Sequence, residues 1–150
     1  MARRLIMVAV VLVLVFAAAQ LVRPERTNPP IDASRTIQAR LGASSPPVAV
    51  LDRACDDCHS NATVWSRYTQ VAPLSWAMAS GVAEGRKAVN FSEWAAYSPE
   101  RQRALLAQSC QDASGGKMPP GVYTLLRPAA RLSAKDVQTI CDAGKVQGLG

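Results

Sequence analysis

The sequence predicts an all-α fold, an expectation that rests on three observations. Apolar residues after the first third of the chain recur at the three- and four-residue intervals of a helix. No segment alternates apolar and polar residues as a half-buried strand would. Prolines and small polar residues stand where helices would begin. We expect four parts: an apolar N-terminal segment over 1–22, a Pro-rich linker over 23–47, a folded domain over 48–143 and a flexible tail over 144–150.

The first part is predicted to be a membrane helix. Residues 5–22 are almost wholly apolar and follow two arginines. Eighteen residues at about 1.5 Å each extend about 27 Å, close to the thickness of a bilayer core. Small residues at 17–19 resemble the cleavage site of a signal peptide, whereas apolar residues continuing to Val22 favour a retained anchor. The preceding arginines predict that the N-terminus stays in the cytoplasm and the rest is exported.

Inside the domain, the first long helix is expected over 73–89. It opens with a proline suited to a first helical turn, and its apolar stripe comprises Leu74, Met78, Gly81 and Val82. A short aromatic-rich segment over 90–97 follows.

Two more helices are expected towards the C-terminus. Ser98-Pro99-Glu100 supplies an N-cap, a first-turn proline and a favourable acid, and the helix runs towards Cys110. Glycines and prolines predict a loop over 111–121. A capping box over 133–136 begins the last helix, which Gly144 is expected to end.

The motif that carries chemistry is Cys55-Asp56-Asp57-Cys58-His59, which contains the only histidine of the chain. A CxxCH sequence is the signature for covalent attachment of c-type haem. The two thiols can form thioethers with the haem vinyl groups, and the histidine can bind the iron. A thioredoxin-type redox pair would expect a neighbouring βαβ pattern, and a zinc site would expect four Cys or His ligands at paired spacings. The sequence shows neither, so we expect one covalent haem c, with Cys55, Cys58 and His59 as binding residues.

Two of the four cysteines lie outside the CxxCH motif. Cys110 and Cys141 suit one disulfide, since thioethers and disulfides both belong to the oxidising side of a membrane. Two buried free thiols are the alternative.

The second axial ligand is predicted to be Met118. One histidine excludes bis-histidine ligation within the chain, which leaves methionine, lysine, solvent or nothing. Met78 lies on an apolar helical stripe, where methionine commonly fills the core. Met118 lies instead in a loop between glycines and prolines, where helical packing does not explain it. Lys117 is the nearest nitrogen competitor. Ligation by His59 and Met118 would raise the reduction potential relative to two histidines.

The region from about 50 to 143 resembles the small haem-binding domains of membrane-anchored, cytochrome c-like proteins. The matching segments are Cys55 to Asn61, Val71 to Trp76, Glu84-Gly85-Arg86, Asn90 to Trp94, Met118-Pro119-Pro120 with Tyr123, and Leu132-Ser133. The resemblance implies a small cytochrome c-like helical domain around one covalent haem. It also implies haem attachment at Cys55, Cys58 and His59, and a distal role for Met118.

Residues around the haem are predicted less directly. The histidine ring should donate its other N–H to a carbonyl, with Pro73 or a neighbouring residue as the candidate acceptor. Arg86 or Lys87 could pair with a propionate, or could equally form a solvated helix end. The aromatic residues that could line the haem, or equally belong to the core, are Trp65, Tyr68, Trp76, Trp94 and Tyr123.

Electron transfer is the expected function, because an iron with both axial positions filled has no open position for substrate. Displacement of Met118 by a gas or a redox change would make the protein a sensor instead. A peroxidase would require a distal base, and no nucleophile with an orienting partner is evident, so we expect no enzyme. The net charge of +6 comes without a basic-aromatic pattern, so no nucleic acid is expected. We expect redox proteins as partners and a single-pass location with the haem on the outer face of the cytoplasmic membrane.

Overall fold

The computed structural model describes residues 1–146, and every regular element in that range is a helix. In chain order the elements are α1 (Ala2–Ala19), η1 (Ala33–Arg35), α2 (Ile37–Leu41), α3 (Pro46–Ala54), α4 (Asp56–His59), η2 (Arg67–Gln70), α5 (Leu74–Ala88), η3 (Phe91–Ala96), α6 (Pro99–Ser114), α7 (Gly121–Leu126), η4 (Pro128–Ala130) and α8 (Ala134–Val146), where η denotes a 3₁₀ helix. The prediction of an all-α fold is therefore confirmed for these residues.

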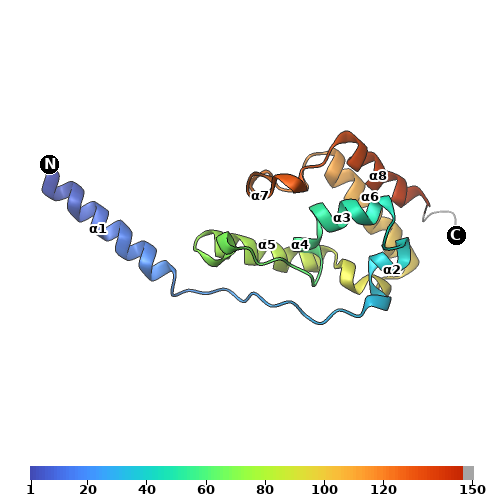
Figure 1. Ribbon diagram of the computed structural model, residues 1–150, viewed down its shortest axis with the longest axis horizontal. Helices are drawn as coiled ribbons and strands as arrows, with labels where there is room; N and C mark the ends of the chain where they lie inside the picture. Colours follow the sequence, from blue (N-terminus) through green and yellow to red (C-terminus); the bar gives the residue numbers. More distant parts are fainter. Residues whose placement is uncertain (147–150) are drawn as a thin grey trace.

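Helix α1 projects from the rest of the molecule, and none of its residues is buried (Figure 1). It is long and apolar enough to cross a membrane, although an N-terminal signal sequence would have the same length and composition. An extended segment after α1 runs along one side of the domain and reaches η1 and α2 at the far end (Figure 1).

The predicted helix starts at Ser98 and Ser133 are confirmed by their caps. The helix expected over 73–89 begins instead at Leu74, with Pro73 before its first turn and no side-chain cap. The Ser98 hydroxyl accepts a hydrogen bond from the backbone N–H of Arg101 at the start of α6. At the start of α8, the Ser133 N–H donates to the Asp136 carboxylate (2.8 Å) and the Asp136 N–H donates to the Ser133 hydroxyl (3.2 Å). These reciprocal bonds satisfy backbone donors that the first turn of a helix leaves free.

Two helix ends differ from expectation. Helix α6 continues past Cys110 to Ser114, so the loop begins only at Gly115. Helix α8 continues through Gly144 to Val146, because Gly144 lies against α6, where an added Cβ would stand 3.6 Å from the Leu106 Cβ. Packing between the two helices overrides the weak helix preference of glycine. Of the tail predicted over 144–150, the first three residues are thus helical, and 147–150 lie outside the described residues.

The core lies between α2, α3, η3 and α6. Its buried apolar residues are Ile37, Leu51, Val89, Phe91, Trp94, Leu105 and Leu106. Ile37 is fully buried although it belongs to the stretch predicted as a linker. The folded domain therefore begins well before residue 48, with η1 and α2, and only the earlier part of 23–47 connects it to α1.

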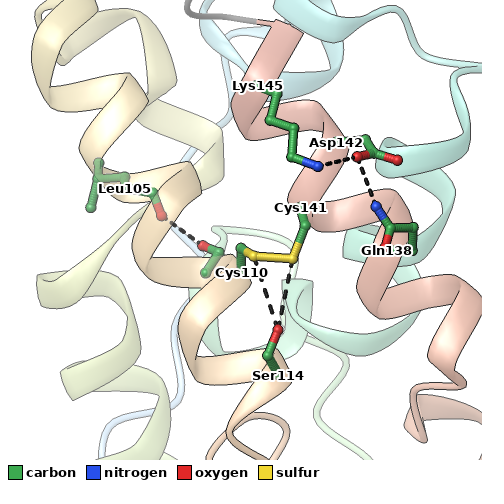
Figure 2. The surroundings of a disulfide bond; sticks show 8 residues. Leu105, Cys110, Ser114, Gln138, Cys141, Asp142 and Lys145 are labelled. Carbon is green, nitrogen blue, oxygen red and sulfur yellow. Dashed lines mark hydrogen bonds and ion pairs between the residues drawn. A yellow bond between two sulfur atoms is a disulfide. The ribbon is translucent and has the colours of Figure 1, made fainter.

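A disulfide joins the two long helices of the C-terminal half. Cys110 of α6 and Cys141 of α8 are bonded, 31 residues apart in the sequence (Figure 2). Ser114 lies one helical turn after Cys110 on α6, and its hydroxyl is 3.7 Å from the Cys141 sulfur. The predicted pairing is confirmed, and it fastens the α6–α8 pair that forms one wall of the site described next.

Candidate functional site

A cavity of about 510 Å³ lies between α4, α5, α6 and the segment from Met118 to Tyr123. Its size is in the usual range for cofactor pockets. Cys55, Cys58, His59 and Met118 all line it. The structure therefore brings the four predicted site residues to one cavity, although Met118 is distant from the others in sequence.

The motif folds as a single tight turn. The backbone N–H groups of Cys58 and His59 both donate to the Cys55 carbonyl, at 3.1 and 3.0 Å. Residues three apart on a helical turn share a face, which explains why both thiols line the same cavity. Both cysteines are free.

The thiols do not have the properties of a redox pair. Burial is the main cause that raises the pKa of Cys55 to about 12 and that of Cys58 to about 11. Reactive CxxC pairs instead have lowered thiol pKa values. Within residues 1–146, no cluster of three or more His, Cys, Asp or Glu could hold a metal ion by itself. Neither the redox-pair nor the zinc interpretation of the motif gains support from these surroundings.

The His59 ring is oriented by two carbonyls of the α5 C-terminus. Its Nδ1 lies 3.0 Å from the Gly85 oxygen and 3.3 Å from the Val89 oxygen. Carbonyls only accept hydrogen bonds, so Nδ1 carries the proton and Nε2 keeps the lone pair that binds a metal. Burial lowers the pKa of His59, which favours this neutral form. The expectation that Pro73 would supply the acceptor is wrong: Gly85 and Val89 supply it.

Gly85 also allows α5 to approach the motif. A Cβ on this residue would stand 2.3 Å from the Cys58 carbonyl oxygen, closer than any side chain permits. The glycine therefore determines how near the His59 ring lies to its carbonyl partners. The sequence drew attention to Gly85 through the Glu84-Gly85-Arg86 segment of the family resemblance. It gave no sign that this residue sets the distance between α5 and the motif.

Asp57, inside the motif, anchors α7. Its side chain is 6% exposed and accepts hydrogen bonds from the Val64 N–H (2.9 Å) and the Tyr123 hydroxyl (2.8 Å). Arg127, directly after α7, forms an ion pair with the same carboxylate. Burial and the bond to Asp57 raise the pKa of Tyr123, so its hydroxyl stays protonated as a donor. A carboxylate at a variable position of CxxCH gave no sign of this role in the sequence.

Met118 lies in the loop that joins α6 to α7. The backbone N–H groups of Lys117 and Met118 both donate to the Asp112 carbonyl, at 2.9 and 3.2 Å, which ties the loop to the end of α6. Gly116 makes this reversal possible with a φ of +67°, a conformation that favours glycine. The Met118 side chain is 41% exposed and lines the cavity. Met78 and Lys117, its rivals in the sequence, are not among the lining residues.

Only one of the five aromatic residues predicted to surround the haem lines the cavity, namely Tyr123. Trp94 is in the core, and the indoles of Trp65 and Trp76 hydrogen-bond to the chain before η1. The core can be distinguished from a cofactor pocket only once helix packing is known.

The predicted propionate partners also lie elsewhere. Arg86 donates to the Ser60 carbonyl (2.8 Å) and the Thr27 carbonyl (3.0 Å), so it fastens the extended segment to the domain. Lys87 forms an exposed pair with Glu84. Neither basic residue lines the cavity.

Comparison with known proteins places the chain in a family. A search of curated proteins and a search of solved structures each give no match. The sequence model of a family described as the haem-binding domain matches residues 14–145, which is most of the chain. The matched range contains the motif, the Met118 loop and both cysteines of the disulfide. The chain therefore belongs to the haem-binding domain family.

Proposed function

We propose that the protein is a monohaem c-type cytochrome that transfers single electrons. In this proposal Cys55 and Cys58 hold one haem c through thioethers, and His59 and Met118 are the axial ligands. The observation that carries it is the convergence of two free thiols, a neutral imidazole and a thioether on one cavity. Bound haem would supply a one-electron iron couple, with a potential raised by Met relative to a second His.

The chain's own residues suit this role. The carbonyls of Gly85 and Val89 hold the imidazole in the tautomer that presents Nε2. The turn at Gly116 and the bonds to the Asp112 carbonyl hold the loop that carries Met118. The walls are largely apolar, which restricts water around a bound cofactor. These contacts bind and orient a one-electron cofactor, which supports the proposal of an electron carrier.

We further propose that α1 anchors the protein in the cytoplasmic membrane as a single pass, with the haem domain on the outer face. The length and composition of α1 support the anchor, and the arginines at its start support the orientation. The partners would be redox proteins at that surface, and not nucleic acid. Without Arg3 and Arg4, which this orientation leaves in the cytoplasm, the net charge falls from +6 to +4, and it favours partners with acidic docking surfaces.

The spectrum of the oxidised, haem-loaded protein tests the ligand assignment. Iron–thioether ligation gives a weak charge-transfer band in the far red, which we expect in the wild type and not in Met118→Ala. Met78→Ala is the matched control, because Met78 lies outside the cavity, and it should keep the band. A band that survives Met118→Ala would contradict His/Met ligation.

Covalent attachment has a separate test. Extraction with acidified acetone should leave haem on the wild-type chain and remove it from Cys55→Ser/Cys58→Ser. Haem extracted completely from the wild type would refute the c-type assignment.

A sensor is the second candidate, and the exposure of Met118 favours it. A ligand that is 41% exposed, on a loop tied mainly through one backbone carbonyl, could leave the iron without disturbing the core. Fast binding of carbon monoxide by the ferrous protein would support the sensor, and slow, weak binding would support the carrier.

A further inference from the structure

The end of the domain next to α1 carries a group of exposed apolar side chains. We call it the collar and define it as Leu21, Val22, Val71, Leu74 and Trp76, which are between 37% and 83% exposed. Large apolar residues clustered on a surface indicate contact with a partner or a membrane.

Hydrogen bonds hold the two parts of the collar together. The Ala72 N–H donates to the Gln20 side-chain oxygen (2.9 Å), and the Trp76 indole N–H donates to the Val22 carbonyl (2.8 Å). Arg26 adds a bond to the Thr69 carbonyl (3.0 Å). The end of α1 is therefore attached to the segment between η2 and α5, and Figure 1 shows these ends side by side.

This attachment determines where the collar would lie relative to a bilayer. Helix α1 is apolar on all sides and ends at Ala19. If α1 spans the membrane, the lipid–water interface falls at its C-terminal end, where the collar begins. Tryptophan is enriched at this depth because its ring is apolar and its N–H is polar. Arg23 directly follows Val22, and Arg67 belongs to η2, just before Val71; both are exposed and can contact anionic headgroups.

We propose that the collar inserts into the interfacial zone of an anionic phospholipid bilayer and holds the haem domain in one orientation against it. The occupant of this apolar surface is then the bilayer, in continuity with the surface of α1. The inference rests on the membrane location proposed for α1. It goes beyond that proposal, because a bare anchor on a flexible segment would leave the domain free to rotate.

Quenching of tryptophan emission by brominated lipid tests the inference on the full haem-loaded chain. The protein is placed in vesicles of phosphatidylcholine and phosphatidylglycerol, with or without acyl chains brominated near the headgroup. We expect bromine to reduce the emission of the wild type. Trp76→Phe should lose this response, whereas Trp65→Phe should keep it, because Trp65 bonds to Asn28 away from the collar. Normalising each protein to unbrominated vesicles removes the quenching caused by haem.

A second pair of variants tests the cause. Val71→Ser/Leu74→Ser should reduce the quenching of Trp76. Ile31→Ser is the matched control, since Ile31 is also exposed and lies in the segment leading to α2. Figure 1 shows α2 at the end of the domain far from α1. Circular dichroism shows whether each variant has folded.

The outcomes separate the two proposals. Protein that does not float with the vesicles would refute the membrane anchor. Protein that floats, but whose emission is insensitive to bromine or equally sensitive in Trp76→Phe, would refute the collar and leave the anchor intact.

Discussion

Replacing Asp57 by asparagine removes the charge that attaches α7 to the turn containing Cys55, Cys58 and His59. The carboxylate is almost fully buried and serves three donors, from Val64, Tyr123 and Arg127. Asparagine has nearly the same shape, and its oxygen can still accept from the Val64 N–H. Tyr123 and Arg127 both donate to the other carboxylate oxygen, and the amide nitrogen that replaces it can accept a hydrogen bond from neither.

The expected loss of stability follows from these contacts. Hydrogen bonds to a charged group contribute about 1.5–3 kcal/mol each. Two of them are weakened, but the Arg127 side chain is 33% exposed and regains water when released. We therefore expect Asp57→Asn to lower the free energy of unfolding by about 3 kcal/mol, at the lower end of values for broken buried pairs. Since α7 follows the Met118 loop, the far-red thioether band should weaken as well.

The assay is guanidinium chloride unfolding of the haem-loaded protein, followed by circular dichroism. Asp142→Asn is the matched control, because Asp142 also accepts from a cation, Lys145, and from an amide, but at the surface. An exposed pair contributes at most about 1 kcal/mol, so this variant should differ little from the wild type. A loss below about 1 kcal/mol in Asp57→Asn, with an unchanged far-red band, would refute the anchoring role.

Three further predictions concern the surroundings of the site. Gly85→Ala should lower the free energy of unfolding by about 1–3 kcal/mol, because the new Cβ overpacks against the motif, and should shift the haem spectrum. Gly121→Ala is the control, because a Cβ there meets nothing within 4 Å, and it should change neither quantity. Equal effects of the two substitutions would contradict the close approach of α5 to the motif. Removing the disulfide by Cys110→Ser/Cys141→Ser should lower stability by about 4 kcal/mol on the chain-entropy model for a loop of this length, and an unchanged denaturation midpoint would refute it. Burial and the neighbouring Asp52 raise the pKa of Asp56 to about 7. The folded state therefore holds a proton that the unfolded chain releases near pH 4. The contribution of this group to stability falls as pH rises from about 4 to 7. Asp56→Asn should flatten that slope and be more stable than the wild type at pH 8, by at most about 4 kcal/mol; a steeper slope would exclude the assignment.

Haem binding could be predicted from the sequence because the CxxCH motif is local. Cys55, Cys58 and His59 lie within one helical turn, and their spacing alone places them together. Helix starts were predicted for the same reason, since caps at Ser98 and Ser133 act on backbone groups two or three residues away.

Helix ends and domain bounds were predicted less well. Whether α8 continues through Gly144 depends on its contact with α6, and whether a Pro-rich stretch is a linker depends on where Ile37 is buried. Neither contact has a local signal, because both join segments far apart in the chain.

The sequence by itself determined the haem-binding chemistry, the apolar N-terminal helix and the all-helical class. Tertiary structure alone decided what orients the site. The carbonyls that face His59 lie 26 and 30 residues away, and the residues that hold Asp57 lie up to 70 residues away. Any backbone carbonyl could accept from His59, and many cations could pair with Asp57, so residue types alone did not identify these partners. The packing of α4 against α5, which the absence of a side chain at Gly85 permits, selected the partners of His59. The position of α7 against the motif selected those of Asp57.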